Sequence, residues 1–313
     1  MRTSVVITFL AAALTVMAKP HAKPDPNFHI YLALGQSNME GQGNVEAQDR
    51  VEDKRFKLIS TADECMGREL GEWYPALPPI VNCYGNLGPV DYFGRTLTKK
   101  LPKEVKVGVC AVAVAGCDIQ LFEEENYKSY EIPDWMQGRI DHYGGNPFRR
   151  LVNIAKKAQK AGVIKGILLH QGETNNGQED WPKRIKVVYE RLLKELNLKA
   201  EEVPLLAGEV VREEYEGMCS LHNTVIKKLP EVIPTAHVIS AEGLDDGGDD
   251  LHFSSASYRI LGERYADKML ELLKKPAKPA DKPQKPQKPA KSEDEQVVSD
   301  VEAADEVDSA DEE

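Results

Sequence analysis

The sequence predicts a three-layer α/β/α sandwich around a mostly parallel, five-stranded sheet. Short apolar runs alternate with segments of helical periodicity between residues 28 and 273, and this alternation is typical of α/β domains. The apolar runs are nearly continuous, as expected for parallel strands that helices cover on both faces. No internal repeat is found.

Five runs share this continuous apolar character, and each is predicted to be a strand. They are Phe28–Leu34, Val105–Val114, Ile164–His170, Val203–Gly208 and Ala236–Ala241.

Three helices are predicted from periodicity and end signals. Pro147–Ala161 begins with a proline and is followed by Gly162, a favoured arrangement of helix ends. Trp181–Leu196 places its aliphatic residues on one stripe, and Ser254–Leu273 closes the domain. The segments Leu70–Gly88 and Leu121–Gly145 lack periodicity and are predicted to be surface loops that shape a pocket.

The N-terminal residues 1–18 are predicted to be a secretory signal peptide. Arg2 supplies the positive charge, residues 5–16 supply the apolar run, and Val16-Met17-Ala18 supplies a cleavage site. An anchored N-terminal helix is the alternative, although the run is short for a membrane span. We therefore expect a secreted protein, extracellular or periplasmic, with no membrane contact after cleavage.

The composition changes abruptly near the C-terminus. Residues 274–291 are rich in Lys and Pro and predict an extended linker, whereas residues 292–313 form an acidic segment that is predicted to be disordered. The domain itself is assigned to residues 19–273. The formal net charge of −11 argues against nucleic acid and anionic membranes as partners. The tail could bind a basic partner, but a solvated tail is favoured.

Five cysteines stand at positions 65, 83, 110, 117 and 219. Disulfides can form in an exported protein, and an odd number leaves at least one cysteine unpaired. Cys65 and Cys83 flank an irregular stretch and could pair, while Cys110 lies in an apolar run and is expected in the core. No ligand spacing typical of a metal site occurs, so no metal is predicted.

One serine, one histidine and one aspartate form the candidate catalytic set. Ser37 follows the first predicted strand, and Asp249 precedes His252 by three residues, so one loop could present both to the same point. A nucleophilic serine needs a base, and the base needs a carboxylate to orient it. The α/β-hydrolase elbow is absent, because Met39 stands where that motif has Gly. Taken alone, Ser37 could instead cap the helix that follows it.

Other polar or permissive residues follow the remaining strands. Ligands bind beyond the carboxyl ends of strands in an open parallel sheet. The backbone N–H groups of Ser37 and Gly116 and the side-chain amide of Gln171 are suitable donors to an oxyanion there. Gly116 could equally be a plain turn glycine and Gln171 a solvating polar residue. His170 is expected to be structural.

The chain resembles the SGNH (GDSL-type) hydrolases, and more closely the sialate O-acetylesterase-like group that includes carbohydrate esterase family 6. The resemblance lies in five stretches across residues 28–260: Gly35–Gly41, Gly88–Arg95, Val112–Gly116, Lys165–Asn175 and Asp250–Phe253. It implies a flavodoxin-like sandwich.

The resemblance also implies roles for individual residues. Ser37 would be the nucleophile, His252 the base and Asp249, rather than Asp250, its acid. Gly116 and Gln171 would complete the oxyanion hole, although the wider superfamily has Asn where Gln171 stands. Supporting or substrate-binding roles are assigned to Asn38, Glu173, Asn175 and Glu209. No metal or organic cofactor is implied.

The leading hypothesis is a monomeric, secreted carbohydrate O-acetylesterase that acts on acetylated plant polysaccharide, with acetylxylan as substrate. A sialate O-acetylesterase is the nearest alternative, and a non-catalytic glycan-binding module is the alternative of another class. Four aromatic residues in the irregular segments could stack on sugars or pack in the core. They are Trp73, Tyr74, Trp135 and Tyr143.

Overall fold

The computed structural model describes residues 23–274. The chain divides into two units, residues 1–277 and 278–313, and all described residues belong to the first. The predicted signal peptide, the acidic tail and all of the linker except Lys274 lie outside the described residues. No helix within residues 23–274 is long and apolar enough to cross a membrane.

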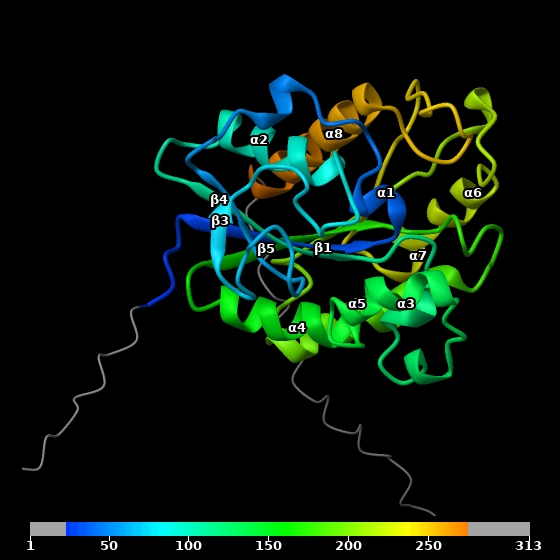
Figure 1. The fold of residues 1–313 in the computed structure, drawn as a ribbon, viewed down its shortest axis with the longest axis horizontal. Helices are drawn as coiled ribbons and strands as arrows, with labels where there is room; N and C mark the ends of the chain where they lie inside the picture. Colours follow the sequence, from blue (N-terminus) through cyan, green and yellow to red (C-terminus); the bar gives the residue numbers. More distant parts are fainter. Residues whose placement is uncertain (1–22, 275–313) are drawn as a thin grey trace, which may run out of the picture. The chain divides into compact units, whose positions relative to one another are not determined.

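A seven-stranded sheet forms the middle layer (Figure 1). Its spatial order is β3-β2-β4-β1-β5-β6-β7, and only the pair of β2 and β3 is antiparallel. The strands are β1 (Phe28–Gly35), β2 (Phe56–Ile59), β3 (Trp73–Pro75), β4 (Lys106–Ala113), β5 (Val163–His170), β6 (Leu205–Gly208) and β7 (Ala236–Ile239).

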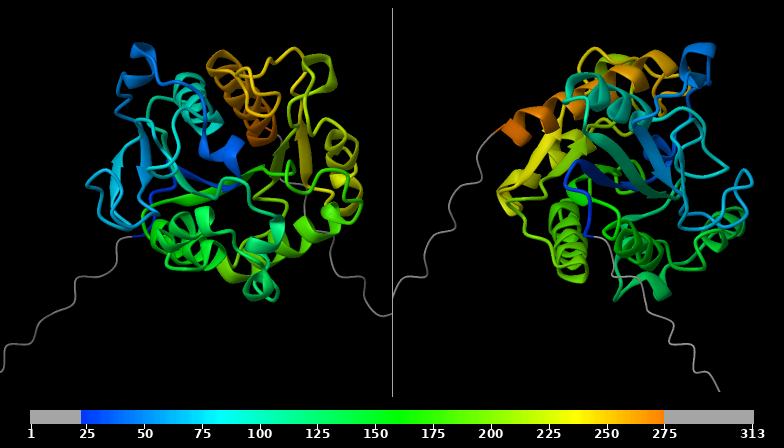
Figure 2. Two further views of the ribbon diagram at one scale, coloured as in Figure 1. Left: turned by 45° about the vertical axis from the view of Figure 1, so that its right-hand side comes forward. Right: turned by 90° about the vertical axis from the view of Figure 1, so that its left-hand side faces the viewer.

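Helices cover both faces of the sheet (Figure 2). On one face lie α1 (Ser37–Glu40), α2 (Pro89–Lys100) and α8 (Ser255–Lys274); on the other lie α3 (Asp134–Asp141), α4 (Pro147–Ala158), α5 (Trp181–Leu196) and the short α6 (His222–Ile226) and α7 (Leu229–Val232). Central β1 supplies both cores, because Ile30 and Leu32 face one helical layer while Tyr31 and Ala33 face the other.

The predicted fold class is confirmed, but the predicted strand number is wrong. All five predicted strands are present with small differences at their ends. The two additional strands, β2 and β3, are short, and they contain Lys57 and Pro75, so neither is a continuous apolar run. β3 and α3 also lie in the two segments that were predicted to be irregular, and α2 was not predicted. The final helix includes Lys274, which had been assigned to the linker.

A close approach of β1 and β5 sets the position of Ser37. A Cβ atom at Gly35 would lie 2.0 Å from the carbonyl oxygen of His170, so only glycine fits at this point. The Gln36 N–H donates to the same carbonyl at 3.0 Å. The turns that follow the two strands, with Ser37 and Gln171, therefore lie side by side.

Two of the five cysteines form a disulfide, and the other three are free. Cys65 and Cys83 form a disulfide that closes part of the irregular segment before α2. Cys110 and Cys117 are free and buried, and Cys219 is free and partly exposed. The core position predicted for Cys110 is confirmed.

Candidate active site

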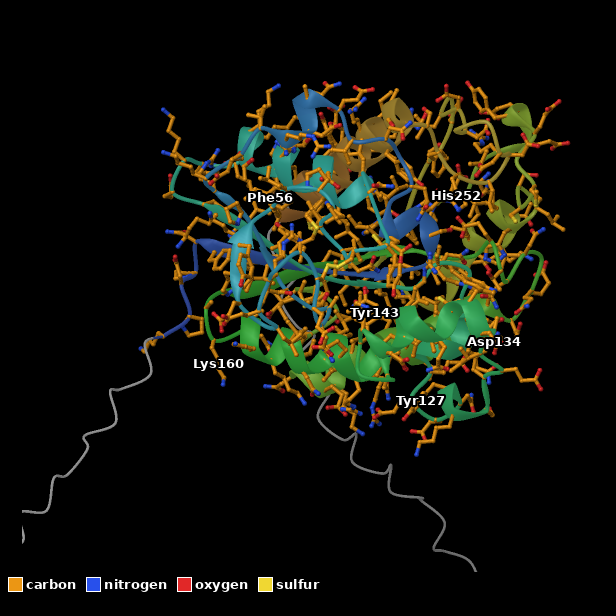
Figure 3. The ribbon with its side chains drawn as sticks, in the orientation of Figure 1. Phe56, Tyr127, Asp134, Tyr143, Lys160 and His252 are labelled. Atoms are coloured by element: carbon orange, nitrogen blue, oxygen red, sulfur yellow. A yellow bond between two sulfur atoms is a disulfide. The ribbon has the colours of Figure 1, made fainter. Side chains whose placement is uncertain are left out.

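Ser37, His252 and Asp249 meet beyond the carboxyl end of β1. Ser37 Oγ lies 2.8 Å from His252 Nε2, and His252 Nδ1 lies 2.7 Å from Asp249 Oδ2. His252 lies on the loop before α8, beside α1 (Figure 3). Ser37 is the first residue of α1, and Gln36 occupies the capping position, so the alternative of a capping serine does not apply. The side chains form a continuous hydrogen-bonded series from hydroxyl to carboxylate.

The loop around Asp249 explains why this aspartate, and not its neighbour, meets the histidine. One carboxylate oxygen of Asp246 accepts the N–H groups of residues 248, 249 and 250. Asp250 has a φ of 58° and is exposed. Asp249 accepts the N–H of His252 at 2.8 Å in addition to the imidazole. Although partial burial opposes it, these hydrogen bonds hold the pKa of Asp249 below its ordinary value.

An open cavity of about 390 Å³ lies over Ser37 and His252. Its lining combines catalytic groups, small polar residues and apolar side chains: Gln36, Ser37, Ala115, Gly116, Trp135, Glu173, Thr174, Met218, Cys219, Leu251 and His252. The lining contains neither Lys nor Arg. The cavity therefore presents both polar and apolar groups next to the serine.

Two residues of the cavity lining, Ser37 and Gly116, are the predicted backbone donors. Ser37 is the first residue of a helix, where the N–H has no intrahelical acceptor. Gly116 has a φ of 72° and lines the same cavity. The prediction that these two N–H groups stabilise negative charge on an oxygen bound beside Ser37 stays a prediction.

Gln171 is predicted from the sequence to face the cavity, but it is not among the residues that line it. Its side chain is buried, and its amide nitrogen lies 2.5 Å from Asn175 Oδ1, 3.2 Å from Gln36 Oε1 and 3.3 Å from the Cys117 carbonyl oxygen. Its oxygen accepts the indole N–H of Trp181. Protein acceptors surround this amide nitrogen, so Gln171 supports the turns, and its role as an oxyanion donor stays a prediction.

Asn38 and Glu173 connect the serine to the histidine loop. The Asn38 amide donates to Glu173 Oε1 at 2.5 Å and to the Leu251 carbonyl at 3.0 Å. Burial raises the pKa of Glu173, and its second oxygen has no hydrogen-bond partner among residues 23–274. Both residues support the site, and Glu173 also lines the cavity.

Asn175 and Glu209 lie outside the cavity lining. Asn175 is fully buried, accepts the N–H of Ile119 at 3.0 Å and donates to Asp118 at 2.6 Å, so it joins the turns after β4 and β5. Glu209 accepts the N–H of Ala241 and lies 3.3 Å from Lys227. Both are placed to support loops rather than to touch a ligand.

Two further histidines belong to the packed interior. Burial lowers the pKa of His170 to about 3 and that of His222 to about 4. Both rings are therefore neutral at ordinary pH. The structural role expected for His170 agrees with this position.

The loop aromatic residues separate into core and cavity residues. Tyr143 is buried and donates to the Ala113 carbonyl, and Trp73 packs on Phe28. Trp135 alone among the four predicted residues lines the cavity. Sequence reasoning did not assign Thr174, Met218, Cys219 and Leu251 to the site. Thr174 and Leu251 lie within recognised motifs, whereas residues 218–219 carry no local signal.

The fold is a three-layer α/β sandwich, and a serine–histidine pair lies at the ends of its parallel strands. Residues 27–271 match the family model described as "Carbohydrate esterase, sialic acid-specific acetylesterase", and the chain belongs to this family. It is therefore a carboxylic ester hydrolase, and more specifically a carbohydrate O-acetylesterase. Within residues 23–274, no group of three potential ligand side chains is arranged to hold a metal ion.

Three solved structures illustrate the similarity of fold. A protein from Arabidopsis thaliana superposes with a TM-score of 0.61 at 19% identity, covering 79% of this chain and 99% of its own. NanS gives 0.59 at 14% identity, with 80% and 99% covered. A carbohydrate acetylesterase from Xanthomonas citri gives 0.51 at 18% identity, with 76% and 54% covered.

Proposed function

We propose that the protein removes acetyl groups from plant polysaccharide, with acetylxylan as substrate, through an acetyl-enzyme formed on Ser37. The observation that carries this proposal is the 2.8 Å contact between Ser37 Oγ and His252 Nε2 at the floor of an open cavity. The secretion expected from residues 1–18 and the monomeric state remain part of the same proposal.

The geometry supports an acyl-transfer sequence in two halves. His252 Nε2 takes the hydroxyl proton as Ser37 Oγ attacks the acetyl carbonyl carbon, and the N–H groups of Ser37 and Gly116 stabilise the oxyanion. His252 then gives this proton to the departing sugar oxygen, which leaves the acetyl group on Ser37. In the second half, His252 Nε2 takes a proton from water as the water oxygen attacks the acetyl carbon. It gives that proton to Ser37 Oγ as the bond to the serine breaks and acetate leaves. Asp249 orients the imidazole and stabilises its charged form.

The charge of the cavity favours a neutral sugar. Its lining contains Glu173 but no Lys or Arg, whereas recognition of a sugar carboxylate usually employs a cationic side chain. Sialic acid carries such a carboxylate, and xylose does not. This difference favours the acetylxylan esterase-like group, carbohydrate esterase family 6, over sialate O-acetylesterases.

The test is acetate release measured in parallel on acetylated xylan and on O-acetylated sialoglycans. We expect faster release from xylan, and a loss on the order of 10⁶ in turnover for Ser37→Ala. Exposed Ser240, which does not line the cavity, provides a matched control as Ser240→Ala. Near-normal acetate release by Ser37→Ala would disprove the role of Ser37 as nucleophile. Faster release from the sialoglycan would disprove acetylxylan as the preferred substrate.

A further inference from the structure

Trp135 is an exposed aromatic residue at the mouth of the catalytic cavity. The relative exposure of Trp135 is 56%, whereas Trp181 is fully buried and Trp73 packs on Phe28. A tryptophan has a large apolar surface that a fold normally buries, and exposed apolar surface beside a site indicates ligand contact. Trp135 lines the same cavity as Ser37 and His252.

The indole lies against the turn that supplies one of the oxyanion donors. A Cβ atom at Gly116 would lie 2.5 Å from the outer edge of the Trp135 six-membered ring. The glycine therefore allows the ring to approach the backbone at this point. A ligand ring that packs on Trp135 would thus lie next to the place where the acetyl carbonyl must bind.

The ring is held by neighbours on the side of α3. The guanidinium group of Arg139, one turn further along this helix, lies 5.6 Å from the Trp135 ring centre and 4.6 Å from that of Tyr84. Tyr84 packs edge-on against His142 at 5.3 Å and follows Cys83 of the disulfide. Such bracing lowers the entropic cost of using the indole to bind a ligand.

The other cavity groups indicate what kind of ligand packs there. Thr174, Glu173 and His252 are polar, whereas Trp135 and Met218 are apolar. A pyranose ring has the matching character, because its C–H bonds form an apolar face and its hydroxyls form a polar rim. A purely apolar ligand would leave the polar groups without partners.

We propose that Trp135 determines specificity by stacking on the C–H face of the pyranose ring that carries the acetyl group. This inference rests on the proposed function and names the residue that distinguishes a sugar ester from a simple acetate ester. The stacked ring holds the ester carbonyl between Ser37 and the Gly116 N–H.

The test compares an acetylated methyl xyloside with ethyl acetate, which has the ester but no ring. We expect Trp135→Ala to reduce kcat/KM for the xyloside about tenfold, the equivalent of about 1.4 kcal/mol, mainly through KM. Its loss of activity on ethyl acetate should be clearly smaller than its loss on the xyloside, since a stacking contact is absent there. Trp135→Phe, which keeps an aromatic face, should recover part of the loss.

A binding measurement gives a readout that does not depend on turnover. In the Ser37→Ala protein, the acetylated xyloside should shift the indole fluorescence, and the added change Trp135→Phe should remove this shift. Tyr127→Ala is the matched control, because Tyr127 lies in the neighbouring 3₁₀ turn (Figure 3) but does not line the cavity.

Two outcomes would overturn the inference. Equal losses on both esters in Trp135→Ala would mean that the indole only supports the Gly116 turn, and no loss on the xyloside would mean that no stacking occurs. Failure of the proposed function would give different results from these two outcomes. The Ser37→Ala protein would stay active, or the wild-type protein would hydrolyse ethyl acetate but not the xyloside.

Discussion

The hydroxyl group of Tyr258 donates a hydrogen bond of 2.5 Å to the side-chain oxygen of Asn38. This contact joins α1, which begins with the candidate nucleophile, to α8, which follows the candidate base. The Phe253 N–H donates to the same oxygen at 3.3 Å, and the Asn38 amide binds the Leu251 carbonyl on the other side of His252. Asn38 thereby fixes the residues before and after His252 relative to Ser37.

Asn38→Ala should lower both stability and turnover. It would leave several buried polar groups without partners, each costing about 1–3 kcal/mol, and would release the histidine loop. Tm and turnover on ethyl acetate are the measurements. Asn44→Ala is the control, because the Asn44 side chain is exposed. An unchanged Tm in Asn38→Ala would contradict the stabilising role of the Asn38 contacts.

Asp249→Asn should cost far more activity than Asp250→Asn. An amide in place of Asp249 cannot stabilise the imidazolium or hold the ring in its correct tautomer, a loss on the order of 10⁴ in a related triad. Asp250 faces solvent and makes no contact with the histidine ring. The measurement is the turnover of both variants under the same conditions. An inactive Asp250→Asn beside an active Asp249→Asn would mean that Asp250, not Asp249, orients the imidazole.

Gly116→Ala should impair catalysis more than Gln171→Ala. The new methyl group would meet Trp135 and would be strained at a φ of 72°, which displaces the N–H donor; losing one such donor costs about 10²–10³ in turnover. Gln171→Ala should mainly lower Tm, since it removes contacts to Asn175 and Trp181. If Gln171→Ala instead lost turnover at an unchanged Tm, the amide would be an oxyanion donor after all.

Asp91 should make stability depend on pH. Burial raises its pKa from 3.8 to about 7, and one carboxylate oxygen has no hydrogen-bond partner in the described part of the chain. Since the folded form binds this proton more tightly than the unfolded form, the free energy of unfolding should fall as the pH rises from about 4 to about 7.

The measurement is the difference in unfolding free energy between the wild type and Asp91→Asn, from urea titrations at several pH values. The difference should decline by a few kcal/mol across this range, at about 1.4 kcal/mol per pKa unit. Exposed Glu104 serves as a control through Glu104→Gln. A difference that stays constant with pH would show that Asp91 titrates normally.

The central part of the fold was predictable because its strands are long and apolar on both faces. β1, β4 and β5 have 8 residues each and give a clear pattern, whereas β2 and β3 depend on pairing at the sheet edge. Ser37 and His252 were identifiable because their motifs are local. The contacts of Gln171 were not predictable, since no sequence pattern tells whether an amide faces the cavity or the Asn175 and Trp181 side chains.

The separation of Ser37 from His252 has a consequence for biosynthesis. The two residues are 215 positions apart, and β1 pairs with β4 and β5, which are both translated later. A chain still being made on the ribosome therefore carries the serine long before it carries the histidine. Hydrolytic activity should begin only when the last helix has emerged and folded, so unfinished chains cannot deacetylate anything.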